Sequence, residues 1–357
     1  MSQLSPTDVA DPALPGVGAS LRGPVMPETE MPVRPFRVAA PPETSAGTRP
    51  CTLLLVAKRT QNHRPDFACL VRYIRQIAPD VRPIVIADWL FQVLRPRLWL
   101  RPTLTFSPLR LRQFRALRGP VFQGNPLSKS QELQRLQEHG ILVPRWAVLT
   151  ETEAPDLSAF GKYVVSKPDR GGRGAEVKIR RKGRLRWSPP ENSGGDRCQD
   201  LLVQEFIYTG PWPVSYRVAT LFGKAIWSWR VEASHERRAL RGPDVFADGA
   251  TGGGMSIVST GQGCRFELNC EPDVIALAEQ AHGAFAEIPL LGVDIIREQP
   301  SGKLYVIEAN SCGRTWHFSG TKGRAIQRQF GFDLEAQFDG LRKAAHILID
   351  QTRRHAA

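Results

Sequence analysis

The sequence predicts an α/β (α+β) protein, on three observations. Residues 51–106 read as strand, helix and two further strands, which is typical of a small α/β unit. The stretch 126–208 combines a capped helix with β-branched runs. Two apolar runs, 215–232 and 290–310, each have turn residues near their centre, as β-hairpins do, and each is followed by apolar residues at helical spacing.

Length and composition narrow the class of protein. A chain of 357 residues is long enough for two or three domains with cores of their own. No apolar run reaches the length of a membrane span, and the first residues lack the basic and hydrophobic regions of a signal peptide. The six cysteines form no CxxC pair, which argues against a zinc site or a disulfide framework. These features predict a cytoplasmic protein that does not enter membranes.

The net charge of +13 has three interpretations: nucleic-acid binding, arginines on solvated faces, or a phosphate-rich substrate. The densest block is 95–118, with seven arginines and no acid. It could dock RNA, an acidic partner or a second subunit of a homo-oligomer. No RNA-recognition motif accompanies the block, so we interpret it as solvated and do not expect nucleic acid as a partner.

The first 122 residues divide into two parts. Residues 1–48 are rich in proline without apolar periodicity, and we expect them to be disordered. From Cys51 onward, "CTLLLVAK" predicts a buried strand, "DFACLVRYIRQIA" a helix, and "RPIVIAD" and "TLTF" two more strands. This predicts a small α/β domain over residues 49–122.

The next segment predicts one helix and several strands. Ser128 or Ser130 can cap a helix that carries Leu133 and Leu136 and ends at Gly140. Strands are expected over residues 146–188 and in "LLVQEFIY". Within this region, "KYVVSKPDRGGRGAEVKIRR" (162–181) runs from strand to strand through a basic, glycine-rich loop, and Lys167 stands where the first strand ends. A strand-to-strand loop with free backbone N–H groups is suited to folding over a polyphosphate.

The rest of the chain predicts two hairpins and two helices. "SYRVATLFGKAIWSWRVE" should turn at Phe222-Gly223, and the polar, glycine-rich stretch 232–256 should be a loop. Its "GATGGGMS" resembles a phosphate-binding loop, but methionine stands where that motif needs lysine, so the match fails. "DVIALAEQAHGAF" predicts an amphipathic helix and "DLEAQFDGLRKAAHILIDQ" one closing helix.

The second hairpin predicts a metal site. If Pro300-Ser301-Gly302 is the turn, Asp294 and Glu308 are each seven residues from its centre and face each other, give or take a bulge. Asn310 shares a face with Glu308 because side chains alternate along a strand. Two carboxylates and an amide oxygen suit Mg²⁺ shared with phosphate oxygens. Since facing carboxylates repel, replacing Asp294 with Asn should not destabilise the metal-free protein. The alternative is an exposed hairpin with scattered acids.

Together these segments resemble ATP-grasp proteins. The match covers residues 120–320 and rests on the order of "VVSKPDRGGRGAEV", "LLVQEFI", "SYRVATLFGKAIWS", "LGVDIIRE" and "LYVIEAN". It is nearest the glutathione synthetase and ribosomal-protein glutamate ligase branch. The resemblance implies an ATP-grasp domain at 123–350, in which two α+β subdomains (123–205, a lid, and 206–350, for metal and substrate) grip ATP.

The resemblance also implies roles for matching residues. Lys129 and Lys167 would meet the ATP phosphates under the glycine loop, and Arg217 would act with Lys167 on the transferred phosphoryl group. Asp294, Glu308 and Asn310 would bind Mg²⁺, for which Mn²⁺ can substitute. The remaining ATP-binding positions would be the loop glycines and the adenine hinge: Gly171, Gly172, Gly174, Gln204, Glu205, Phe206 and Ile207. The family often has an acid for the ribose shortly after the hinge, but none occurs here between Glu205 and Glu232.

The function implied is an ATP-dependent carboxylate–amine ligase that forms an acyl phosphate and releases ADP and phosphate. Its substrates would be small-molecule or peptide carboxylates and amines. The alternatives are a small-molecule kinase on the same fold and a non-catalytic ATP- or RNA-binding module. His317 could touch substrate or be a satisfied surface or core residue, whereas Trp227 and Trp229 share a strand face and are expected in the core.

Overall fold

A computed structural model describes residues 50–57, 63–87, 101–111, 114, 118–171, 177–189, 200–235, 239–240, 242, 263–311 and 315–356. The segment 1–48, Gly172, Gly174 and parts of both the arginine block 95–118 and the loop 232–256 lie outside these residues. Residues Thr48–Ala357 form one compact unit, and the structure described below is that unit.

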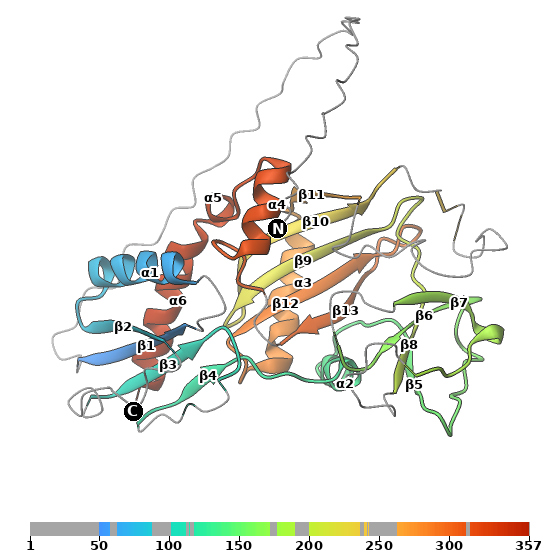
Figure 1. Ribbon diagram of the computed structural model, residues 1–357, viewed down its shortest axis with the longest axis horizontal. Helices are drawn as coiled ribbons and strands as arrows, with labels where there is room; N and C mark the ends of the chain where they lie inside the picture. The colour runs from blue at the N-terminus through green and yellow to red at the C-terminus, as the bar shows by residue number, and fades with distance from the viewer. Residues whose placement is uncertain are drawn as a thin grey trace, which may run out of the picture. The chain divides into compact units, whose positions relative to one another are not determined.

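A parallel sheet opens the unit (Figure 1). Its order is β2-β1-β3-β4, formed by β1 (Cys51–Ala57), β2 (Val81–Ala87), β3 (Thr103–Ser107) and β4 (Val121–Gln123). Helix α1 (Arg64–Ile77) connects β1 to β2. Every residue of β1 is buried, as expected for a central parallel strand covered on both faces. Strands β1 to β3 and helix α1 confirm the sequence-based elements, whereas β4 was not predicted as a strand.

The second sheet is antiparallel, with the order β5-β8-β6-β7. Its strands are β5 (Trp146–Leu149), β6 (Tyr163–Pro168), β7 (Lys178–Arg181) and β8 (Leu201–Glu205), and a 3₁₀ turn, η3 (Lys182–Arg184), follows β7. Helix α2 (Lys129–Glu138) precedes them. Ser128 caps α2 in a capping box with Gln131, and Gly140, at φ +71°, follows the helix end.

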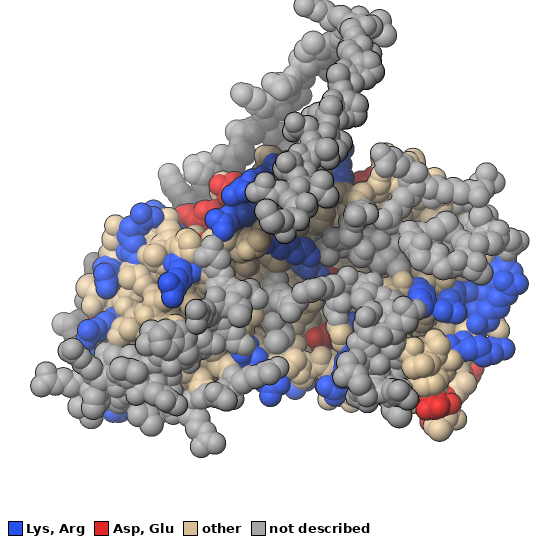
Figure 2. All heavy atoms as spheres, in the orientation of Figure 1, with Lys and Arg blue, Asp and Glu red and all other residues tan. Residues whose placement is uncertain are grey.

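Part of the positive charge lies on this second sheet. Strand β7 reads KIRR and the turn after it reads KGR. Figure 2 shows Lys and Arg side chains gathered at the end of the molecule where Figure 1 draws β7. Among the described helices, none combines the length and apolar character needed to cross a membrane.

The third sheet is antiparallel and has the order β11-β10-β9-β12-β13. Its strands are β9 (Val214–Leu221), β10 (Lys224–Ala233), β11 (Cys264–Leu268), β12 (Leu290–Arg297) and β13 (Leu304–Asn310). Helix α3 (Pro272–His282) and the 3₁₀ turn η4 (Gly283–Phe285) precede β12. Phe222 and Gly223 join β9 to β10 with φ of 46° and 80°, the paired positive angles of a type I′ turn. Both predicted hairpins are thus confirmed, whereas β11 was not predicted.

The chain closes with α4 (Thr321–Phe330), α5 (Leu334–Phe338) and α6 (Gly340–His355). Helix α4 was not predicted. The prediction of one closing helix over 333–351 was wrong, because Asp339 adopts φ +50° and divides the segment into α5 and α6. The break lets Gly340 approach the third sheet, where an added Cβ would lie 2.7 Å from the carbonyl oxygen of Ile226.

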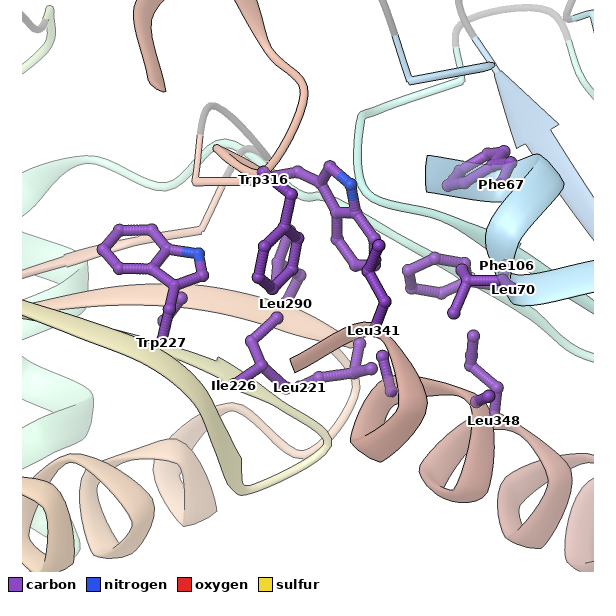
Figure 3. Packing of buried hydrophobic residues seen from close by; sticks show 14 of the residues in the cluster. Phe67, Leu70, Phe106, Leu221, Ile226, Trp227, Leu290, Trp316, Leu341 and Leu348 are labelled. Carbon is purple, nitrogen blue, oxygen red and sulfur yellow. The ribbon is translucent and has the colours of Figure 1, made fainter. Parts of the chain in front are cut away.

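A hydrophobic cluster joins the first sheet to the third. Trp316 is at its centre, with ring centroids 6.0 Å from Phe67 of α1 and 6.2 Å from Phe106 of β3. Figure 3 shows Trp316 between these rings and Trp227 of β10. Trp227 and Trp229 are buried, which confirms their predicted place in the core. The shared core fixes the segment after β13 against the parallel sheet.

Candidate functional site

The candidate metal ligands lie on three neighbouring strands of the third sheet. Asp294 of β12 is paired with Glu308 of β13 on one side and with Arg217 of β9 on the other. Asn310 lies opposite Gly292, and its side-chain amide nitrogen donates to Asp294 Oδ2 at 3.1 Å. The structure therefore brings together all three predicted metal ligands and the predicted catalytic arginine.

The facing pair depends on a β-bulge. Asp294 pairs with Glu308, but the next pair toward the turn is Ile295 with Val306, so Ile307 is the extra residue. The turn is also longer than the predicted three residues, because the Glu298 N–H donates to the carbonyl of Lys303 at 2.8 Å. The bulge offsets this longer turn. Without it, Asp294 would pair with Ile307, and the side chains of Glu308 and Asn310 would point to the opposite face of the sheet.

Lys167 connects the second sheet to this bulge. It lies on β6 with 6% of its surface exposed, and its Nζ donates to the carbonyl oxygen of Ile307 at 3.3 Å. Burial lowers the pKa of Lys167, and the neighbouring Lys129 lowers it further, while Glu308 opposes the shift. An ammonium held in this way can be stabilised by incoming phosphate oxygens.

Lys129 reaches the same region from the first turn of α2. Its Nζ donates to the carbonyl oxygen of Gly171 at 3.0 Å, and its backbone N–H donates to the carbonyl of Asp169 at 2.9 Å. Ser130 donates to the Asp169 carboxylate through its backbone N–H at 2.7 Å and through its hydroxyl at 3.0 Å. These bonds join α2 to the loop that follows Lys167. Gly171 has φ +119°, which a residue with a side chain rarely adopts.

Arg217 forms a two-pronged ion pair with Asp294. Its Nε donates to Asp294 Oδ1 at 2.6 Å and its Nη2 to Oδ2 at 2.5 Å. Burial alone would lower the pKa of Arg217, but the charge and hydrogen bonds of Asp294 outweigh it and raise that pKa. Asp294 thus has a cationic partner. That partner contradicts the premise that Asp294 meets only repulsion in the metal-free protein, and we now expect Asp294→Asn to destabilise it, because the change leaves Arg217 without its full partner.

The predicted adenine hinge begins at the end of β8. Gln204 is 3% exposed, and its amide nitrogen has no hydrogen-bond partner in the described part of the chain. Glu205 accepts from Arg145 at 3.4 Å and from the Gly161 N–H at 3.3 Å, so its carboxylate contacts the second sheet. Phe206 and Ile207 follow the strand, and the Phe206 N–H donates to the carbonyl of Tyr163 at 3.3 Å.

The residues present fit a magnesium-bound nucleotide. Asp294, Glu308 and Asn310 supply hard oxygen donors, while two lysines from the second sheet and α2 supply positive charge for phosphates. The unpartnered amide nitrogen of Gln204 can donate to a ring nitrogen of adenine. Among the described residues no three His, Cys, Asp or Glu side chains form a metal-binding group, so phosphate and water oxygens would have to complete the coordination of Mg²⁺.

Glu132 was missed by the sequence analysis. It is 5% exposed and accepts a hydrogen bond from Ser311 Oγ at 3.2 Å. Burial raises the pKa of Glu132 well above its usual value, and the charge of Glu308 adds to this shift, whereas Lys129 opposes it. A signal was present: Glu132 is three residues after Lys129, which places both on one face of the predicted helix.

Comparison with protein-family models gives a match to the ATP-grasp domain over residues 127–315, more than half of the chain. No curated protein matches the sequence. Among solved structures, D-alanine–D-alanine ligase from Bacillus anthracis is 14% identical with a TM-score of 0.44, covering 84% of this chain and 99% of that chain.

Two other solved structures are complexes with precursors. The ATP-grasp ligase PsnB complexed with minimal precursor, Mg and ADP is 15% identical with a TM-score of 0.49, covering 85% of this chain and 98% of that chain. The macrocyclase MdnC bound with precursor peptide MdnA from Microcystis aeruginosa MRC is 12% identical with a TM-score of 0.47, covering 84% of this chain and 99% of that chain.

Proposed function

This chain belongs to the ATP-grasp family, and from that premise we propose that it is an ATP-dependent carboxylate–amine ligase that releases ADP and phosphate. The observation that carries the proposal is the convergence of two sheets on one strand. Lys167 of the second sheet bonds to Ile307 of β13, next to Glu308. Glu308 faces Asp294 of β12, which is paired in turn with Arg217 of β9. Phosphate-binding charge and metal-binding oxygens therefore lie side by side.

The proposed reaction has two steps. A carboxylate oxygen of the first substrate attacks the γ-phosphorus of ATP, which forms an acyl phosphate and breaks the bond to ADP. An amine then attacks the acyl carbon, forms the amide, and displaces phosphate. In this scheme the described residues supply no covalent nucleophile. They position the reacting groups and supply charge that stabilises the phosphates.

Each group has a proposed role in these steps. Lys129 and Lys167 hold the phosphates, and Gln204 together with the backbone of Phe206 and Ile207 holds adenine. Asp294, Glu308 and Asn310 would hold Mg²⁺, which would supply electrophilic charge to the phosphates. Arg217 would exchange Asp294 for the transferred phosphoryl group, since a guanidinium binds either anion through two parallel hydrogen bonds.

The branch of the family, the class of substrate and the domain bounds are also proposals. We place the chain nearest the glutathione synthetase and ribosomal-protein glutamate ligase branch, on the motifs quoted above, with small-molecule or peptide substrates. Residues 49–122, 123–205 and 206–350 are proposed as pre-domain, lid and metal subdomain. The third sheet and its helices supply most of the proposed metal and substrate side.

An ADP-release screen over pairs of carboxylates and amines tests the function. For a ligase, phosphate release requires both substrates together, and ¹⁸O in the carboxylate appears in the released phosphate because the acyl phosphate carries that oxygen. A kinase releases ADP without an amine and retains the phosphorylated carboxylate. ADP release without ¹⁸O transfer would refute the acyl-phosphate route. The Lys167→Met variant serves as the inactive control, and wild-type protein that releases no more ADP than this variant would refute the proposed enzymatic activity.

A further inference from the structure

His317 is a buried imidazole next to the proposed site. It is 6% exposed, and its Nε2 is buried without a hydrogen-bond partner among the residues described. Its ring stacks on Trp229 with centroids 5.2 Å apart at 18°, and its centroid lies 5.4 Å from that of Trp227. The sequence left open whether it was satisfied, and within the described part of the chain its Nε2 is not. A buried polar atom without a partner is costly, so its retention calls for an explanation.

The segment around His317 is held on two sides. Asp66 of α1 accepts from Trp316 Nε1 at 2.8 Å and from the Ser319 N–H and hydroxyl at 3.1 and 2.7 Å. On the other side, α4 begins so close that a Cβ on Gly323 would overlap the carbonyl oxygen of His317. The ring position is therefore set by contacts on both sides of the segment, as a binding group requires.

The electrostatic surroundings of His317 favour an anion. The groups acting on it are Arg217 of β9, Lys322 in the first turn of α4, and His63, and each disfavours a second positive charge there. Burial, reinforced by these groups, lowers the pKa of His317 to about 3. At neutral pH the ring is uncharged and carries one N–H. The partial positive charge at the start of α4 acts in the same direction.

We propose that His317 Nε2–H donates a hydrogen bond to the carboxylate of the first substrate, beside Arg217. This rests on the proposed function and deepens it by assigning a subsite. An ammonium substrate is disfavoured there because Arg217 and Lys322 are cations, whereas a carboxylate gives the buried nitrogen its missing partner. When the amine attacks, the acyl oxygen gains negative charge, and a neutral N–H already aimed at it stabilises that charge without transferring its proton.

Direct binding can be tested without knowing the substrate. Full-length protein labelled with ¹⁵N-histidine is titrated with sodium acetate, the simplest carboxylate, and with sodium chloride at equal ionic strength. We expect a saturable shift of the His317 Nε2–H resonance with acetate and none with chloride, while the ring stays neutral. No saturable shift with acetate, or conversion of His317 to imidazolium, would overturn the proposal. This readout does not depend on ligase activity.

Two variants of His317 separate its proposed role in substrate binding from its role in the core. His317→Phe keeps the ring stack but removes the N–H, so it should raise the KM for the carboxylate found by the ADP screen about tenfold or more and leave the KM for ATP unchanged. His317→Gln, which can place an amide N–H near the same point, should recover part of the loss. His317→Phe should also melt no lower than wild type, because it removes an unsatisfied polar group. The KM effect should be the same from about pH 5 to about pH 8, because the ring does not titrate there.

His63→Phe is the matched control. His63 is also buried, with both ring nitrogens unpartnered in the described structure, but it lies against Phe67 at 5.9 Å, on the α1 side of Trp316. Its replacement should leave the KM for the carboxylate unchanged. An equal rise in KM for both variants, or a pH-dependent effect that breaks near the usual pKa of histidine, would overturn the assignment to His317.

Discussion

Replacing Asp294 with Asn separates the structural role of this residue from its proposed metal role. Arg217 and Asp294 are only 21% and 15% exposed at their side chains, so water screens their interaction little. The two charge-assisted bonds, at 2.6 and 2.5 Å, contribute about 1.5–3 kcal/mol each. Asn retains one oxygen acceptor, so about one bond is lost and the guanidinium keeps an uncompensated charge.

We therefore expect Asp294→Asn to lower the free energy of unfolding by about 2–3 kcal/mol in the absence of nucleotide and metal. At about 2–4 °C per kcal/mol, the melting temperature should fall by about 5–10 °C. The assay is a melting curve in EDTA, repeated with Mg²⁺ and a non-hydrolysable ATP analogue. Wild type should gain stability from magnesium with the analogue, and the variant should gain much less.

A double-mutant cycle with Arg217→Gln identifies the cause. If the pair itself is responsible, the double variant loses clearly less than the sum of the two single losses. Additive losses, or an Asp294→Asn protein that melts at or above the wild-type temperature in EDTA, would refute the ion-pair argument. Equal gains from magnesium and analogue in wild type and variant would instead refute Asp294 as a metal ligand.

Three other predictions concern separate parts of the molecule. Lys167→Met keeps the aliphatic stem and removes the charge, so calorimetry should show ATP affinity reduced about tenfold or more, and unchanged affinity would contradict the phosphate role. Burial raises the pKa of Glu335 to about 7. The protonated carboxyl group therefore stabilises the fold fully below its unfolded pKa of about 4.5, and this stabilisation is lost as the pH rises through 7. Glu335→Gln should flatten the dependence of the melting temperature on pH, and an unchanged slope would contradict this assignment. Gly340→Ala should lower the free energy of unfolding, measured with denaturant, by about 1–3 kcal/mol, because the added Cβ would lie 2.7 Å from both Ile226 O and Phe318 Cζ. A variant as stable as wild type would show that the neighbouring atoms move aside freely.

Local pattern was enough to predict much of the fold. The alternation around Phe222-Gly223 and around Pro300–Gly302 predicted both hairpins, because side-chain period and turn residues are properties of short segments. The cap at Ser128 and the stop at Gly140 predicted α2 for the same reason. Elements without a strong local signal were missed: β4 has three residues, β11 follows a long glycine-rich stretch, and α4 is preceded by no side-chain cap.

The break at Asp339 illustrates the limit of local reasoning. The apolar spacing of 333–351 is that of one helix, but the chain turns there so that Gly340 can lie against β10 and Phe318. No pattern within the segment encodes the position of a strand more than a hundred residues earlier. Low helix propensity at Asp339 and Gly340 permits the break, and tertiary packing decides its geometry.

The sequence by itself determined which residues could form the site: the order of the strands, the charges on them, and the spacing that put Glu308 and Asn310 on one face of their strand, whereas the bulge at Ile307 set Asp294 opposite Glu308. Only the tertiary structure decided how they are partnered. It placed Arg217 on Asp294, Lys167 on the carbonyl of the bulge residue Ile307, Glu132 in the same buried group, and His317 against Trp229 with its Nε2 unpartnered among the described residues. The physical reason is that spacing along a strand is fixed by covalent geometry, whereas pairing between sheets, burial and the resulting pKa shifts depend on groups brought together from distant parts of the chain.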